Sequence, residues 1–261
     1  MSVSSRGAVT IKAGFASAPP CTASTCLAPS AFTWVRGYPS VLYGINQCHA
    51  ETSPPPSRLL PLPMRLASIG RRLVGVTAYS ANTAHVTYDV SYDLWLHDTS
   101  TKRPCRSAGT LEIMVWTDYA EAALLPGNMQ VTTASVPFAV DGVARTGTRA
   151  WSVYASNINA AGRTAPWGGT LWFVLDRADT VSHGRVSVDL SAVLSAAELL
   201  LQDNYGWPQL GHRYWLDTAS FGVEFGPANA GPTDSGPSRF SVLISAYCLA
   251  VASTLATAKC A

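Results

Sequence analysis

The amino-acid sequence predicts an all-β protein, an antiparallel β-sandwich or jelly roll of two sheets with one packed α-helix. About ten segments alternate apolar and polar side chains or form short apolar stretches, as strands do. The 20 Gly, 17 Pro, 10 Tyr and 8 Trp suit a β-rich chain with many turns. Only one segment has helical spacing, and neither a repeat nor a linker divides the chain. We therefore expect a single main domain.

The bulk composition excludes several classes of protein. Of the 261 residues, 48% are hydrophobic and 13% are charged, so the chain has enough apolar surface for a large core. The net charge of +2 comes without a long basic run, so no nucleic-acid partner is expected. The most apolar stretch, 242–256, is interrupted by Ser and Thr and is short for a membrane span, so no membrane partner is expected.

The predicted elements divide the chain into three parts. Residues 1–33 are rich in Ala, Ser, Thr and Pro, and we interpret them as truncated first strands or the remnant of a leader, with one candidate strand at 9–13. The jelly-roll domain is expected at 34–247, and 248–261 is expected to be a tail. The predicted strands of the domain are 34–44, 59–69, 73–78, 84–97, 111–116, 130–140, 150–154, 169–175, 214–226 and 240–247.

Two connections have recognisable local signals. The Asp-Gly pair at 141–142 predicts a hairpin turn between 130–140 and 150–154. A helix is predicted from about 190 to 202, where apolar residues recur at the spacing of one helical face, with Ser187 or Asp189 available as N-cap.

The cysteines indicate the compartment but not their pairing. Six dispersed Cys allow fifteen complete pairings, among which the sequence does not choose. An even number of Cys fits an oxidising environment, so we expect a secreted protein, although the first residues lack the apolar core of a signal peptide. No Cys or His spacing is typical of zinc, so neither a metal nor another cofactor is expected.

Two glutamates lie in the middle of predicted strands, on faces that do not fit a plain core. Alternation in 111–116 places Glu112, Met114 and Trp116 on one face and three aliphatic residues on the other. In 214–226, Glu224 lies among small residues that leave its face open. An unpaired Glu on a core face would be costly.

The strand before Glu112 carries the same mixture of side chains. In 84–97, Asp89, Asp93 and Trp95 lie on the polar face. Two carboxyls placed across a sugar can cleave a glycosidic bond, one attacking or activating water and the other protonating the leaving oxygen. The residues alone leave open the alternative that each Glu is a rim residue paired with an Arg.

Five motifs, in this order, resemble glycoside hydrolase family 12, the small jelly-roll endoglucanases. They are Tyr-Pro-Ser-Val at 38–41, Leu-Pro-Met-Arg-Leu at 62–66, Tyr-Asp-Leu-Trp at 92–95, Leu-Glu-Ile-Met-Val-Trp at 111–116 and Phe-Gly-Val-Glu-Phe at 221–225. The resemblance extends from about residue 34 to 247. It implies a concanavalin-like two-sheet fold and a secreted, monomeric enzyme. This enzyme would be an endo-acting retaining β-glucanase that hydrolyses β-1,4-glucosidic bonds of cellulose-type glucans.

The resemblance also implies roles for individual residues. Glu112 would be the nucleophile, Glu224 the general acid/base, and Asp93 a neighbour that supports Glu112. The residues expected to bind substrate are Met114, Trp116, Trp95, Pro126 and Gly127.

This sequence departs from the family pattern in three places. The Asn-x-Trp strand that usually opens family members is missing, because the first Trp is Trp34. Only Cys48 follows the Tyr-Pro-Ser-Val segment, where some bacterial relatives have two Cys. The tail has no counterpart that we can place.

Other interpretations of these residues remain open. The chain could be a non-catalytic β-glucan-binding module, or a hydrolase of the same fold specific for xyloglucan or mixed-linkage glucan. Trp151 and Trp172 are expected in the core, and His85 and His97 are expected to be solvated or hydrogen-bonded. Asp118 and Glu121 are expected to be loop charges at the rim of the cleft.

Overall fold

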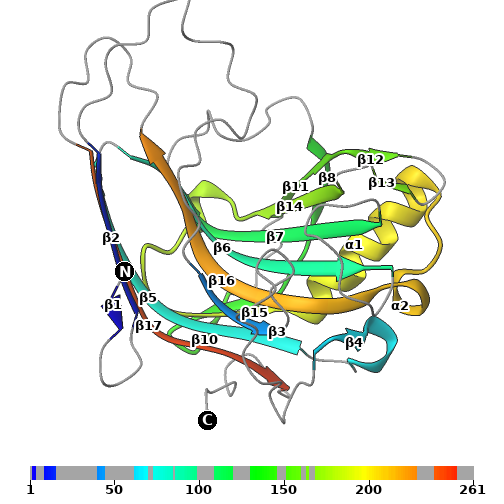
Figure 1. The fold of residues 1–261 in the computed structure, drawn as a ribbon, viewed down its shortest axis with the longest axis horizontal. Coiled ribbons are helices and arrows are strands. Elements are labelled where there is room, and N and C mark those ends of the chain that lie inside the picture. Colours follow the sequence, from blue (N-terminus) through cyan, green and yellow to red (C-terminus); the bar gives the residue numbers. More distant parts are fainter. Residues whose placement is uncertain are drawn as a thin grey trace, which may run out of the picture.

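The computed structural model describes most of the predicted domain, and its strands form two large sheets. The described residues are 2–3, 9–15, 40–44, 62–69, 73–84, 86–98, 109–119, 130–145, 151–159, 163–164, 168–227 and 238–251. Figure 1 shows the two sheets as curved layers with the helix α1 at one end. The predicted two-sheet β-jelly roll with one packed helix is confirmed.

Sheet A contains both ends of the described chain. Its strand order is β1-β2-β17-β5-β15-β9-β10. The strands are β1 (Ser2–Val3), β2 (Val9–Phe15), β17 (Ser238–Val251), β5 (Leu73–Ala84), β15 (His183–Asp189), β9 (Phe138–Val140) and β10 (Val143–Ala144). The strand expected at 9–13 is therefore present, and it pairs with β17. β17 continues into the segment that the sequence marks as a tail.

Sheet B carries the candidate catalytic residues. Its order is β3-β16-β6-β7-β14-β11-β8, and β4 (Met64–Arg65) pairs with β16. The strands are β3 (Ser40–Gly44), β16 (Trp215–Pro227), β6 (Val86–His97), β7 (Thr110–Tyr119), β14 (Gly169–Val174), β11 (Trp151–Ser156) and β8 (Gln130–Ala134). The β7–β14 pair is parallel, whereas the other described pairs are antiparallel. A separate pair consists of β12 (Ile158–Asn159) and β13 (Arg163–Thr164).

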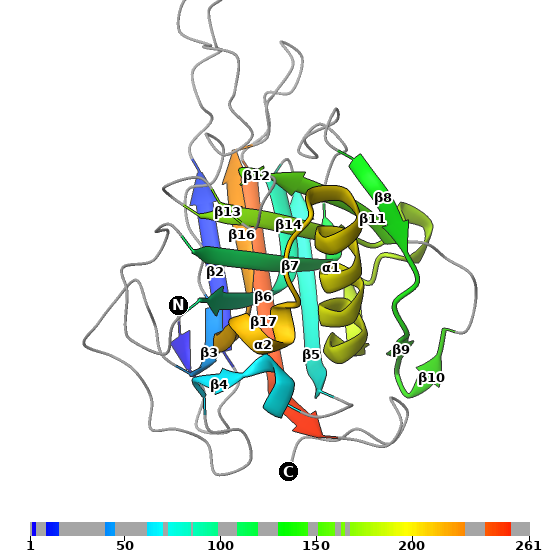
Figure 2. The same cartoon turned by 90° about the vertical axis from the view of Figure 1, so that its right-hand side faces the viewer.

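Helix α1 covers one end of the sandwich (Figure 2). It spans Leu190–Tyr205, longer than predicted because it continues to a C-cap glycine, Gly206, whose positive φ of 64° suits a residue without a side chain. Asp189 is the N-cap, and its carboxylate accepts a hydrogen bond from the backbone N–H of Ala192. The remaining helical segments are short: η1 (Leu66–Ser68), η3 (Arg177–Asp179) and α2 (Leu210–Arg213).

The main core lies between the sheets. The apolar positions of β6 and β7, including Leu94 and Ile113, are fully buried there. Tyr92 contacts Phe221 at a ring-centroid distance of 4.8 Å, and its hydroxyl lies 2.7 Å from that of Thr77 on the facing sheet. A Cβ at Gly75 would lie 2.6 Å from the Tyr92 ring, so glycine makes this close approach possible.

The predicted hairpin between 130–140 and 150–154 is correct in its pairing but not in its turn. β8, the first part of 130–140, pairs antiparallel with β11 in sheet B. Asp141 and Gly142 form a turn, but it joins β9 to β10 in sheet A. The sequence signals identified the pairing and the turn but not the strands that the turn connects.

Two further features bear on the surroundings of the protein. Cys248 on β17 is disulfide-bonded, whereas the other cysteines lie outside the described residues. In the described part of the chain, no helix is both long and apolar enough to cross a membrane.

Candidate active site

The face of sheet B that points away from sheet A, called here the outer face, combines carboxyls with aromatic side chains. Residues opposite each other in a sheet point to the same side. The strand register therefore places the following residues on the outer face: Asp89, Ser91, Asp93 and Trp95 of β6; Glu112, Met114 and Trp116 of β7; Thr170, Trp172 and Val174 of β14; Tyr154 of β11; and Ser220, Gly222 and Glu224 of β16.

The residues directly opposite Glu112 on the neighbouring strands are uncharged. Glu112 is 7% exposed and lies opposite Trp95 on one side and Thr170 on the other. The hydroxyl of Thr170 donates a long hydrogen bond of 3.4 Å to Oε2 of Glu112. Such a donor favours the ionised carboxylate, which a nucleophile requires.

Asp93 lies diagonally next to Glu112 on the outer face. The residue directly opposite Asp93 is Met114, two positions along β7 from Glu112. Asp93 is 2% exposed, and its Oδ1 accepts a 2.9 Å hydrogen bond from the hydroxyl of Ser91. Diagonal neighbours of this kind lie within reach of long side chains. The predicted supporting role of Asp93 is compatible with this position.

Glu224 lies opposite another carboxyl, Asp89, rather than next to Glu112. Their strands are separated by β6, and the β6 positions opposite Glu224 and Glu112 are Asp89 and Trp95, six residues apart. Asp89 is fully buried, whereas Glu224 is half-buried. Burial, followed by the charges of Glu224 and Asp93, raises the pKa of Asp89 well above its usual value.

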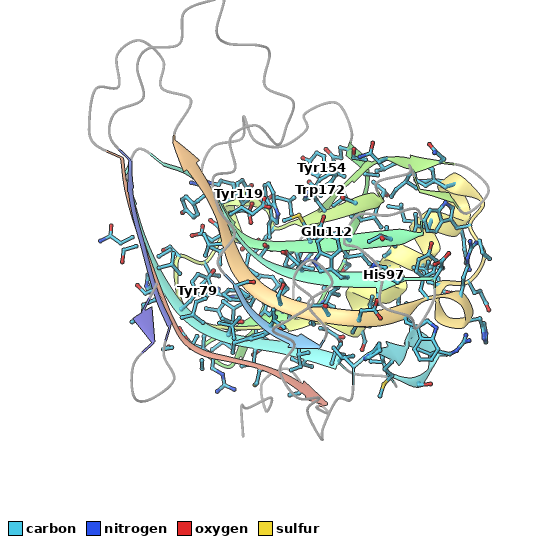
Figure 3. All side chains as sticks on the ribbon, viewed as in Figure 1. Tyr79, His97, Glu112, Tyr119, Tyr154 and Trp172 are labelled. Carbon is cyan, nitrogen blue, oxygen red and sulfur yellow. The ribbon has the colours of Figure 1, made fainter. Side chains whose placement is uncertain are left out.

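The aromatic part of the outer face is a cluster on β7, β14 and β11. This outer-face cluster consists of Met114, Trp116, Tyr119, Tyr154, Trp172 and Val174. Figure 3 shows Tyr154 and Trp172 close to Glu112, with Tyr79 on the opposite side of sheet B. The indole N–H of Trp116 is buried and has no hydrogen-bond partner among the described residues. The members of the cluster are 2–7% exposed, so its rings are buried, but rings and an indole N–H are groups of the kind that stack on sugars and hydrogen-bond to their hydroxyls.

The remaining predicted binding residues are only partly placed. Trp95 is half-buried on the outer face beside Glu112. Pro126 and Gly127 lie outside the described residues.

One expectation about an individual side chain needs correction. Asp118 is not a loop charge: it belongs to β7, is 3% exposed and accepts a hydrogen bond from the Tyr88 hydroxyl. Trp151 and Trp172 are both buried as expected, Trp151 in the main core and Trp172 in the outer-face cluster. His97 is fully buried and pairs with Asp217, which agrees with the bonded alternative rather than the solvated one. His85 and Glu121 lie outside the described residues.

Sequence reasoning did not select Asp89, Tyr154 or Trp172 for the site. The signal for Asp89 was available, because alternation places it on the same face as Asp93. Tyr154 and Trp172 lie on neighbouring strands, and their meeting depends on the β11–β14 register. Among the described residues, no group of three His, Cys, Asp or Glu side chains could hold a metal ion.

The fold and this face together define a class of protein. A jelly roll that carries carboxyls and flat apolar surface on one face has the groups that cleavage of a glycosidic bond requires. The sequence model of Glycosyl hydrolase family 12 matches residues 21–232, so the chain belongs to this family and is a glycoside hydrolase.

Solved structures of the same fold belong to this family as well. A family 12 xyloglucanase from Bacillus licheniformis, in complex with ligand, is 23% identical, with 85% of this chain and 77% of that chain covered and a TM-score of 0.55. The endo-1,4-β-glucanase CelB2, a cellulase, is 21% identical, with 84% and 77% covered and a TM-score of 0.54. At these identities the likeness demonstrates the fold alone. No curated protein matches the chain.

Proposed function

We propose that the chain is a secreted, endo-acting β-glucanase that hydrolyses internal β-1,4-glucosidic bonds with retention of configuration. The observation that carries this proposal is the placement of Glu112 and Glu224 on one outer face of sheet B, beside the outer-face cluster, in a chain of family 12. The disulfide at Cys248 supports secretion.

The proposed reaction has two steps. Glu112 attacks the anomeric carbon while Glu224 donates its proton to the departing glycosidic oxygen, which leaves a glycosyl group bonded to Glu112. Glu224, now a carboxylate, then takes a proton from water, whose oxygen bonds to the anomeric carbon as the bond to Glu112 breaks. Retention requires the two carboxyls to approach to about 5–5.5 Å. The two positions are six residues apart along β6, about 20 Å of extended strand, so the curvature of sheet B has to supply most of this approach.

The substrate class within the β-glucans is the finer part of the proposal. The solved structures of similar fold include a xyloglucanase and an endo-1,4-β-glucanase. Xyloglucan and mixed-linkage glucan are therefore kept as alternatives to cellulose-type chains. The alternative of a different class is a β-glucan-binding module without hydrolysis.

Release of reducing ends from soluble carboxymethyl cellulose, barley glucan and xyloglucan, measured in parallel, tests both levels of the proposal. We expect release from at least one polymer, with a rapid fall in viscosity because internal bonds are cut. Binding to the polymers without release from any of them would establish the binding module instead. Release from xyloglucan alone would overturn the assignment to cellulose-type chains.

A further inference from the structure

We propose that Asp89 is a positioning residue for Glu224: their two carboxyl groups share one proton, which Asp89 holds at the acid/base side chain. The role of Glu224 in this statement rests on the proposed function, whereas the shared proton rests on the structure of the outer face.

The first observation is the position of the pair. β16 and β6 are antiparallel neighbours, and Glu224 lies directly opposite Asp89 on the same face. Directly opposed residues have Cβ atoms about 4.5–5.5 Å apart, so two acidic side chains at these positions meet. The negative charge of Glu224 raises the pKa of Asp89.

The second observation is that the other described groups compensate the burial of Asp89 only in part: Ser91 lowers the pKa of Asp89, but less than burial and the neighbouring charges raise it. Neither of its carboxyl oxygens has a hydrogen bond of standard geometry with a described residue, although both are buried. Ser91 lies two positions away, but its hydroxyl proton is donated to Asp93. On β7, the residue opposite Asp89 is Tyr119, which Arg177 contacts through the backbone carbonyl and the ring.

The charges around Asp89 are negative. The described groups that act on its carboxyl are Glu224 from β16 and Asp93 and Ser91 from its own strand, and none of these is a cation. A buried carboxylate without a cation is costly, and two adjacent carboxylates repel each other. One proton between Asp89 and Glu224 removes the repulsion and supplies the missing hydrogen bond. Burial and these charges accordingly raise the pKa of Asp89.

A shared proton suits both steps of the proposed reaction. In the first step, the pair keeps a proton beside the leaving oxygen at a pH at which an isolated carboxyl would have lost it. Once that proton has moved to the glycosidic oxygen, Asp89 and Glu224 are both ionised and repel each other. This repulsion makes Glu224 a stronger base for the proton of the attacking water.

Carboxyl ¹³C NMR titration of the full chain, labelled in Asp and Glu side chains, tests the inference without a substrate. In the wild type, we expect the signals of Asp89 and Glu224 to follow the same two protonation steps, because coupled groups titrate as a pair. In Glu224→Gln, Asp89 should titrate in one step, with its pKa lower than in the wild type because the charge of Glu224 is gone. In Asp89→Asn, Glu224 should likewise titrate in a single step, because its partner no longer binds a proton.

Asp93→Asn is the matched control. It removes a neighbouring charge but leaves Asp89 opposite Glu224, so the two shared steps should remain. If Asp89→Asn does not fold, the Asp89 signal in Glu224→Gln decides the matter alone. An Asp89 titration that is the same in the wild type and in Glu224→Gln would overturn the shared proton. Absence of glucan hydrolysis with coupling present would instead overturn the proposed function.

Discussion

Glu112 and Glu224 lie on the same face of one sheet, in opposite surroundings. Glu112 has a hydroxyl donor, Thr170, and the uncharged Trp95 as its cross-strand neighbours. Glu224 faces the buried carboxyl of Asp89. A hydroxyl donor favours an ionised carboxylate, whereas an adjacent acid favours a proton between the two groups. Asp93 also lies diagonally next to Glu112, so the contrast concerns only the directly opposed residues, and within that limit it favours the proposed roles of Glu112 as nucleophile and Glu224 as acid/base.

The largest expected effect is the loss of hydrolysis when the nucleophile, Glu112, is replaced. Glu112→Gln keeps the size of the side chain but removes the charge that attacks the anomeric carbon. We expect the rate of glucan hydrolysis to fall by at least about 1,000-fold, with oligosaccharide affinity nearly unchanged. Initial rates together with calorimetric binding would measure both quantities.

The matched control for this variant is Glu198→Gln, which makes the same chemical change on α1, away from the outer face. Its hydrolysis rate should equal that of the wild type. Retention of most of the rate by Glu112→Gln would mean that the nucleophile is another residue.

The second expected effect concerns the acid/base position. Glu224→Ala should lower hydrolysis of ordinary glucans by about 100-fold or more, because the leaving oxygen lacks a proton donor. The hydrolysis rate of a substrate whose leaving group departs without protonation should fall much less. Added azide should restore part of the turnover of that substrate and yield a glycosyl azide, because azide attacks the intermediate without a base. Loss of activity that is equal on both substrates, with no azide product, would contradict the role of Glu224.

The smallest expected effect concerns Asp118, which lies on the core-facing side of sheet B, opposite to the face that carries the two glutamates. Burial raises the pKa of Asp118 on the core side of β7, although its hydrogen bond from Tyr88 opposes the shift. The folded state therefore binds this proton more tightly than the unfolded state, and stability falls as pH rises from the unfolded pKa through the folded one. Asp118→Asn avoids ionisation, so its stability relative to the wild type should increase from pH 4 to pH 8, by the order of 1 kcal/mol.

Urea unfolding at several pH values would measure this trend. Tyr88→Phe is the opposing control, because removal of the hydrogen bond to Asp118 should make stability fall more steeply with pH. A stability difference between the wild type and Asp118→Asn that does not vary with pH would show that Asp118 ionises as readily in the fold as in the unfolded chain.

Much of the outer face was predictable, because strand alternation is a local property. Period two in 84–97 and 111–116 places Asp93 and Glu112 on polar faces, and the register confirms that they share the outer face. The helix at 190–202 was equally predictable from apolar spacing and the Asp189 cap.

Register and bulges were not predictable, because they depend on contacts between distant segments. Asp89 meets Glu224 only in the β6–β16 register, which includes an irregularity between Leu216 and Thr218. The β6–β7 register shifts between Val90 and Ser91, so that alternation on β7 is reversed and Asp118 turns toward the core. An extra residue of this kind leaves no sign in the sequence pattern.

The central claim is that Glu112 forms a covalent bond to the sugar. A 2-deoxy-2-fluoro cellobioside with a good leaving group tests this claim most directly. The fluorine slows both the formation and the hydrolysis of the glycosyl-enzyme intermediate, but the good leaving group speeds its formation, so the intermediate accumulates. Intact mass spectrometry should show the protein gaining one fluoroglycosyl unit, and peptide mapping should place it on Glu112. A label on a different residue, or release of glucan products by an enzyme that never becomes labelled, would contradict the account.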